Sequence, residues 1–481
     1  MIKKLLCIAT LSILSMPVAF AGGLLHNTNQ HIDFVRMMAR GASFDIDGVY
    51  TNPAGSVFNE HQGWTLSLNI QSAYQERDVN ATFPLYMNPT HTKLYEGNAS
   101  APIIPSLYGV YHKDKLAVSG FLGVVGGGGK CSFDDGLPMF DAAVMAGVYG
   151  QTAALLNQYP ALGAVFSGPV TPDQYDISTA MKGRQFIYGA QLGAAYRFLP
   201  WLSGYAGFRM DYFTGNYSGH VIATAGPELT GKVTQLAMAY PEMAQLLGSY
   251  AGPGGLASIK LDCDQTGWGI TPIVGVDLKF GDLTLAAKYE FPTELNIEND
   301  TKQLEVSPSA FEGALNSFKD GVNTPNDLPS VFYFAAGYEF IPKKLRGTLE
   351  YHYYDDKHAE MAGDKQKALR HGTHEVLAGV EWDINERFTV SCGAQNTDYG
   401  LSDEYQSHTS FSCDSYSIGF GGAVNINENM KLNVGYFWTT YHDYTKDVPA
   451  GNPGYCGTTM AGKDVYSRSN KVFGVGLDYK F

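Results

Sequence analysis

The charged side chains that could contact a small ligand occur in mixed pairs. Arg209 is two residues from Asp211, and Lys288 is two residues from Glu290. A cation of this kind could bind a carboxylate on a ligand whose remaining surface is apolar. The neighbouring acid could instead neutralise the cation within the protein. Arg209 and Lys288 are therefore candidate ligand contacts, with a structural ion pair as the alternative for each.

The sequence lacks motifs typical of enzymes. It contains no G-x-S-x-G motif, and His371-Gly-Thr-His374 has neither helical spacing nor the nearby carboxylates expected of a zinc site. The run 126–129 is not followed by the Lys-Ser/Thr and helix of a phosphate-binding loop, so we expect a flexible linker there. The net charge of −14 argues against a nucleic-acid partner. We expect no catalytic residue, metal or cofactor.

The N-terminus is typical of an exported protein. Lys3 and Lys4 precede an apolar run, 5–18, and Ala19-Phe20-Ala21 matches a signal-peptidase site before Gly22. Beyond this site we find no window approaching about 18 uncharged apolar residues, so we expect no membrane-spanning helix. If the mature chain spans a membrane, it must do so with strands.

The C-terminus reads as such a strand. Phe473, Val475, Leu477, Tyr479 and Phe481 alternate with small or polar residues, and alternate side chains of a strand point to opposite faces. A strand between lipid and a wet lumen requires this pattern. A half-buried edge strand of a soluble sandwich is the alternative.

The same period-two pattern recurs along the chain, whose composition of 55 Gly, 31 Tyr and 26 Phe suits strands with aromatic girdles. It predicts fourteen strands, an even number that leaves both ends of a barrel on one side. The predicted strands are 64–71, 103–112, 115–125, 185–198, 201–214, 267–280, 282–292, 330–341, 344–354, 374–384, 386–396, 412–425, 430–441 and 470–481.

The lengths of the connections support a barrel. Every second connection is short, and the alternate ones are long, above all 126–184 and 215–266. Outer-membrane barrels have short periplasmic turns and long external loops. We therefore predict an all-β, fourteen-stranded antiparallel transmembrane barrel over 63–481, after a signal peptide at 1–21.

Residues 22–62 have no period-two pattern and could plug the lumen. The third strand is also irregular, because it is apolar on both faces and interrupted by Gly120 and Gly123. Such a strand either packs on something inside the lumen or bends. An imperfect strand beside a glycine-rich loop is the alternative.

Within 22–62, acidic Asp45 and Asp47 precede the tripeptide Asn52-Pro53-Ala54. With the signal peptide, the strand count and the C-terminal Phe481, the mature chain resembles the FadL family of outer-membrane transporters for long-chain fatty acids and other hydrophobic compounds. Family members have an N-terminal hatch with an Asn-Pro-Ala motif, fourteen strands and a C-terminal Phe.

The resemblance implies roles for particular residues. The motif at 52–54 would pack against a kinked third strand, containing Gly120 and Gly123, whose inward bend opens the barrel wall. The mature N-terminus, Gly22, Gly23, Leu24 and Leu25, would reach an internal ligand site, although it lacks the early aromatic of the family. The C-terminal strand would be recognised by barrel-assembly machinery.

Two long loops contain apolar, helix-compatible segments, 139–156 and 233–247. Exposed apolar helices usually mark a contact site, and in the FadL family two such loop helices form the groove that captures substrate. The candidates are Phe140, Val144, Leu236 and Met243. The alternative is that the two segments pack together as a lid without a ligand role.

Five cysteines remain after cleavage. Cys392 shares the apolar face of its strand, so we expect a free thiol facing lipid. Cys131, Cys263, Cys413 and Cys456 lie in or beside external loops of an oxidising compartment. Three pairings are possible, and loop proximity favours Cys131 with Cys263 and Cys413 with Cys456.

The expected function is passive import of long-chain fatty acids or similar hydrophobic molecules across the outer membrane, by a monomer in contact with outer-membrane lipid. The molecule would be captured at the external loops and released through the wall. A general or polar-solute channel, or an adhesin-like barrel, is the alternative.

Overall fold

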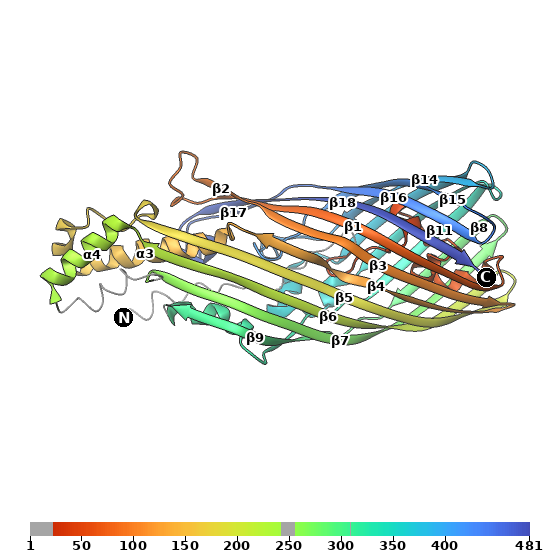
Figure 1. Cartoon of the computed structure of the whole chain (residues 1–481), viewed down its shortest axis with the longest axis horizontal. Coiled ribbons are helices and arrows are strands. Elements are labelled where there is room, and N and C mark those ends of the chain that lie inside the picture. The colour runs from red at the N-terminus through yellow and green to blue at the C-terminus, as the bar shows by residue number, and fades with distance from the viewer. Residues whose placement is uncertain (1–22, 242–254, 308) are drawn as a thin grey trace.

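The computed structural model describes residues 23–241, 255–307 and 309–481. Over these residues the chain forms a closed antiparallel barrel of fourteen wall strands with a helical N-terminal segment (Figure 1). The barrel closes where the first strand pairs with the last, from Thr65 opposite Lys480 to Thr82 opposite Lys463. The predicted signal peptide, Gly22 and Met243 lie outside the described residues.

The wall strands follow one another around the barrel in chain order. They are β1 (Gly63–Thr82), β3 (Gly97–Lys113), β4 (Leu116–Phe133), β5 (Tyr175–Leu199), β6 (Leu202–Ala225), β7 (Ala257–Phe280), β8 (Leu283–Glu290), β11 (Val331–Ile341), β12 (Leu345–Tyr354), β13 (Thr373–Asp383), β14 (Phe388–Asp398), β15 (Ser415–Asn425), β16 (Met430–Tyr441) and β18 (Gly462–Lys480). Four further strands extend the wall: β2 (Thr92–Tyr95), β9 (Asn296–Ser307), β10 (Asn323–Pro325) and β17 (Tyr444–Val448). β2, β9 and β17 pair with wall strands, and β10 pairs with β9.

All fourteen predicted strands overlap a wall strand, but several are longer than predicted. β5 begins at Tyr175, ten residues before the predicted start at Gln185. Its added outward residues include Asp176, Ser178 and Lys182. The alternation of apolar and polar residues fails there because the outward face is no longer apolar, while backbone pairing with β6 continues without interruption.

The outer face of the barrel is apolar over a continuous belt. On β5 the outward side chains of Tyr188, Leu192, Tyr196 and Phe198 are 47%, 53%, 45% and 57% exposed. The same strand buries Gln185 and Gln191 on its inner face. A soluble protein rarely exposes so large an apolar surface. The chain is therefore a transmembrane barrel with a polar interior.

The two ends of the barrel differ. The C-terminus lies at the end with short turns, and the helices α3 (Pro138–Gln158) and α4 (Pro227–Ala239) lie at the opposite, external end (Figure 1). By length and composition α3 could cross a membrane, although the sequence was not expected to contain such a segment. In the structure α3 instead covers the external end, where Asp141 accepts hydrogen bonds of 2.6 Å from Tyr95 and from Lys93.

Short helices complete the fold. In the N-terminal segment these are α1 (Ile32–Arg36), α2 (Gly48–Thr51) and the 3-10 helix η2 (Pro53–Phe58), all buried. We call residues 23–62 the hatch; residues 23–58 lie mostly buried inside the barrel, and the chain then emerges toward β1. The loops hold the 3-10 helices η3 (Pro160–Ala164), η4 (Pro172–Gln174), η6 (Ser309–Phe318), η7 (Asp356–His358), η8 (Ala362–Ala368) and η9 (Tyr455–Gly457).

Candidate functional site

The wall of the barrel is interrupted between β3 and β4. Their pairing is regular up to Leu107 opposite Leu122 and resumes only at Ser100 opposite Lys130. On its other side β4 shifts register against β5 between Val124 and Gly126 and again between Gly126 and Gly129. Leu122 still faces outward and is 52% exposed, whereas Val124 and Val125 are both buried. We call residues 123–129 the β4 bend.

The hatch supplies the hydrogen bonds that β3 does not make. The Gln30 side chain accepts from the Val124 amide at 3.0 Å and donates to the Val124 carbonyl. The Asn27 amide donates to the Val125 carbonyl at 2.8 Å, and His26 pairs with Gly126 as an isolated β-bridge. The bend is therefore held inward by hatch residues 26–30.

The glycines of β4 differ in their roles. Gly120 pairs regularly with Gly109 and Leu192, so it lies before the bend and does not form it. A Cβ on Gly126 would lie 2.4 Å from the Leu25 carbonyl oxygen, and one on Gly123 would lie 2.8 Å from Gln30 Oε1. Gly127 and Gly129 have positive φ angles of 78° and 79°, which favour glycine. The run 126–129, expected as a linker, is part of β4.

The tripeptide Asn52-Pro53-Ala54 is anchored to a different part of the wall. The Asn52 side chain donates to Asp277 Oδ2 on β7 at 2.6 Å, and Ser203 on β6 donates to the Ala54 carbonyl at 2.6 Å. Pro53 begins η2, where its missing N–H is tolerated. The hydrogen bonds of the motif thus join the hatch to β6 and β7, and residues 26–30 make those to the β4 bend.

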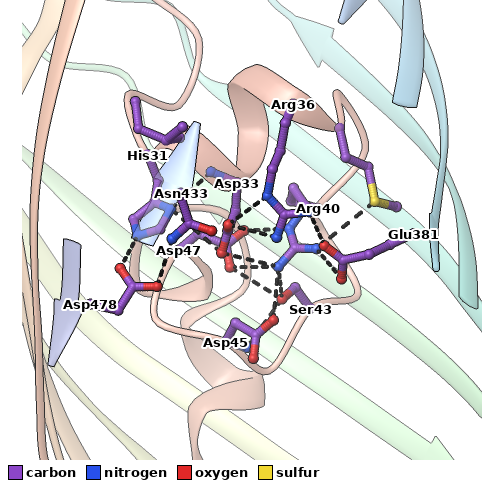
Figure 2. A network of polar contacts seen from close by, with 12 residues as sticks. His31, Asp33, Arg36, Arg40, Ser43, Asp45, Asp47, Glu381, Asn433 and Asp478 are labelled. Atoms are coloured by element: carbon purple, nitrogen blue, oxygen red, sulfur yellow. Dashed lines mark hydrogen bonds and ion pairs between the residues drawn. The ribbon is translucent and has the colours of Figure 1, made fainter. Parts of the chain in front are cut away.

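A buried network of charges fixes the hatch to the opposite wall (Figure 2). Arg36 donates to Asp33 at 2.7 Å and to Ser391 at 2.7 Å, and it is ion-paired with Glu381 of β13. Arg40 is bound to Asp47 at 2.8 Å and reaches Glu381 at 3.2 Å. We call these residues, with His31, Asp45 and Asp478, the hatch charge network.

The charges in this network set the ionisation of its members. Burial alone would raise the pKa of Asp33, but Arg36 and Lys431 hold that pKa well below its usual range. Burial alone would lower the pKa of His31, but Asp33 and Asp478 raise it. His31 Nε2 lies 3.3 Å from Asp478 Oδ1. His31 therefore links the hatch to β18.

Two sets of side chains in this region have the spacing of metal ligands among the described residues. They are His31, Asp33 and Asp478, and Asp33, Asp45 and Asp47, with ligand atoms within 4.8 Å of one another. Asp33, Asp45 and Asp47 already contact the guanidinium of Arg40. These carboxylates are therefore neutralised by arginine, and a metal ion would have to displace it.

The predicted cations Arg209 and Lys288 are fully enclosed. Arg209 is bound to Asp211 and to Glu290, both at 2.8 Å. Lys288 is bound to Glu290 at 2.6 Å, donates to the Tyr50 carbonyl at 2.7 Å and lies 3.9 Å from the ring centre of Tyr333. Both side chains thus belong to a charge cluster beside the hatch.

The first described residues of the hatch lie beside this cluster. Leu24 and Leu25 are buried in an apolar core with Phe121 and Val125 of β4. Burial lowers the pKa of His26 to about 3, so its ring is neutral. Among the described residues, His26 Nδ1 and Arg209 Nη2 are buried polar atoms without a hydrogen-bond partner. A polar group of a ligand could satisfy either atom.

The external loops bury most of their predicted contact residues. Phe140, Val144 and Leu236 are 8%, 2% and 1% exposed. They belong to one cluster, formed by α3, α4 and the outer ends of β4 to β7. We call it the external apolar cluster. The two loop helices therefore share one apolar core at the external end of the barrel.

The cysteines are not bonded to one another. Cys131, Cys263, Cys413 and Cys456 are free thiols, so the two predicted disulfides are absent. Cys131 and Cys263 share one row of the wall, with Gly183 of β5 and Tyr217 of β6 between them. Three strand spacings of about 4.8 Å separate them along the wall, whereas a disulfide needs Cα atoms within about 7 Å.

Thiol counting checks this arrangement. We expect the folded, purified protein to migrate identically on reducing and non-reducing gels and to yield five alkylated cysteines after unfolding. Exposed Cys392 should react first in detergent. Two or four protected thiols in the unfolded, unreduced protein would contradict the structure.

Comparison with solved structures identifies the architecture. No protein-family model matches the sequence, and no curated protein matches it. A Pseudomonas aeruginosa FadL homologue matches with a TM-score of 0.61 at 13% identity, over 96% of this chain and 100% of that chain. The chain has the FadL-type fold. The P. putida toluene transporter TodX shares the FadL-type fold, with a TM-score of 0.53 at 13% identity over 91% of this chain and 94% of that chain.

Sequence reasoning missed the residues that hold the FadL-type hatch in place. The roles of Gln30, Arg36 and Arg40 could not be assigned, because these residues lie in a segment without periodicity and their wall partners are distant in sequence. Glu381, for example, is 341 residues from Arg40. The mixed charges of the hatch, at Asp33, Arg36 and Arg40, were the available hint.

Proposed function

We propose that this chain is an outer-membrane transporter that lets hydrophobic molecules enter the cell passively. The FadL-type fold supports this, since its solved examples include a FadL homologue and a protein described as a toluene transporter. The apolar outer belt supports a position in a membrane. The difference between the long loops at one end and the short turns at the other supports the orientation of the barrel in that membrane. In this proposal the transported molecule enters the barrel at its external end.

The observation that carries the proposal is the missing pairing between β3 and β4. A polar-solute channel needs an open aqueous lumen, whereas here the hatch occupies the barrel and is anchored to β6, β7 and β13. A hydrophobic molecule has another exit, because it is stable in the membrane itself. In our proposal it leaves sideways through the wall at the β4 bend.

The route would begin at the external apolar cluster, where Phe140, Val144 and Leu236 offer an apolar surface once the loop helices separate. It would continue to Leu24 and Leu25, beside the unpartnered atoms of His26 and Arg209. A carboxylate on the transported molecule would satisfy Arg209 Nη2. A neutral hydrocarbon would leave it unpaired.

Uptake by cells tests the proposal. We expect cells that produce this protein to accumulate labelled oleate or toluene faster than cells that lack the gene, without added energy. Oleate and toluene separate an acidic cargo from a neutral one. Equal uptake of both compounds with and without the gene, together with steady ion conductance in planar bilayers, would contradict the proposal and favour a general channel.

A further inference from the structure

The outer wall of β4 and β5 bears unpaired cations. Lys130 of β4 lies directly opposite Arg184 of β5, and Lys182 is the next outward residue along β5. All three side chains are exposed. Among the described residues none of the three is ion-paired with a carboxylate, whereas other exposed cations such as Lys302 and Lys343 are. We call these three residues the outer cation patch.

This arrangement is unfavourable in the protein alone. Like charges directly opposite each other on adjacent strands repel and destabilise the pair. Such unpaired cations are also unusual in a chain of net charge −14, in which acidic residues outnumber basic ones. The nearest outward acids on β7, Asp262 and Asp264, instead accept hydrogen bonds from Asn216 at 3.0 and 2.9 Å. An anion from outside the chain would relieve the repulsion.

The position of the patch along the membrane normal indicates which anions can reach it. On β5 the outward residues are apolar or aromatic from Phe198 to Phe186, and Arg184 is the first polar one beyond them. On β7 the outward Trp268 is 66% exposed, and polar residues follow it toward the external end. Aromatic residues at this position mark the membrane interface. The cations therefore lie level with the headgroups of the outer leaflet.

The wall beside the patch is hollowed. A cavity of about 410 Å³ on the outer face of β5, β6 and β7 is lined by Lys182, His220 and Lys260, around small residues at Ala180, Ser218 and Gly219. His220 is bonded to Ser178 at 3.1 Å, and Lys260 lies 3.4 Å from Glu305. Lys182 thus joins the patch to a concave surface above the aromatic residues, lined by basic side chains and by no acidic one.

We propose that the outer cation patch and this hollow bind the phosphate groups of a glycolipid in the outer leaflet. The phosphates sit between Lys130, Lys182 and Arg184, and the acyl chains lie against the apolar belt below Phe186. Lysine and arginine clusters at a membrane surface bind anionic lipid headgroups in this way. The inference depends on the orientation of the barrel and not on the transported molecule.

Binding of lipid to the purified protein in detergent micelles tests the proposal, with diphosphoryl lipid A as the probe. One variant replaces all three cations, Lys130→Gln, Lys182→Gln and Arg184→Gln. Its affinity for the lipid should be about a hundredfold weaker, because each cation near a membrane surface raises the affinity by about tenfold or less. A matched variant replaces three exposed lysines elsewhere, Lys302→Gln, Lys463→Gln and Lys471→Gln, and should bind as the wild type does. Heat-modifiable gel mobility confirms that both variants fold.

Two further binding measurements show whether the bound anion is the phosphate of a lipid or free phosphate. Dephosphorylated lipid A should bind the wild type as weakly as diphosphoryl lipid A binds the patch variant. Inorganic phosphate should not displace the lipid at equal concentration. Equal lipid affinity of the two triple variants, equal affinity for both lipids, or displacement by free phosphate would overturn the proposal. Uptake of hydrophobic molecules should be unchanged in the patch variant.

Discussion

Replacing Arg36 by methionine should release the hatch and turn the barrel into an open pore. The change removes a buried cation that contacts Asp33, Ser391 and Glu381. Loss of one partner of a buried ion pair costs roughly 3–5 kcal/mol, because the remaining charges stay buried without compensation. We expect a large rise in single-channel conductance in planar bilayers and greater sensitivity of cells to large hydrophilic antibiotics.

An exposed ion pair of the same type serves as the control. Lys343 lies 3.0 Å from Glu60, and the two side chains are 76% and 83% exposed. Exposed pairs of this kind contribute roughly 0–1 kcal/mol, so Lys343→Met should leave conductance and antibiotic sensitivity unchanged. A wild-type conductance in Arg36→Met would show that other contacts hold the hatch.

Replacing Gln30 by methionine should abolish uptake while the barrel still assembles. Methionine has a similar length but cannot replace the two hydrogen bonds to Val124. The Val124 carbonyl would keep only the 3.5 Å bond from Asn27 Nδ2, and the buried Val124 amide would be unpaired. This costs about 2 kcal/mol, which shifts the balance from the bent toward a straight, β3-paired strand by roughly thirtyfold. The wall would then close, and oleate or toluene uptake should fall to that of cells lacking the gene.

The matched control removes a hatch-to-wall hydrogen bond away from the bend. Ser203→Ala deletes the 2.6 Å bond to the Ala54 carbonyl and should retain uptake. Heat-modifiable mobility shows whether each variant has formed a barrel. Normal uptake in Gln30→Met would refute release through the wall at the β4 bend, and loss of uptake in both variants would assign the effect to the hatch as a whole.

The strands were largely predictable because the membrane imposes a local rule. Each wall residue faces either lipid or the lumen, so alternation shows in a short window, as at 473–480 in β18. The rule failed beyond the apolar belt, where β5 continues to Tyr175 with polar residues facing outward. The alternation rule also could not show that Gly120 lies before the bend. The position of the bend depends on where β4 stops pairing with β3.

The candidate site was predictable only as a region. The irregular third strand and the segment 22–62 were evident from broken alternation. The partners of the hatch residues could not be predicted from the sequence. Gln30 bonds to Val124, which is 94 residues away, and Arg36 bonds to Ser391, which is 355 residues away. The predicted Cys131–Cys263 disulfide failed for the same reason, because loop proximity in sequence does not give the distance around a barrel wall.

The sequence by itself determined the number, direction and faces of the wall strands, and the end of the barrel that carries the long loops. Each of these follows from neighbouring residues in one strand or turn. The tertiary structure alone decided that Gln30 holds the β4 bend, that Arg36 and Arg40 fix the hatch to β13, and that Lys130 faces Arg184. Those contacts depend on strand register and barrel closure, which join residues far apart in the chain.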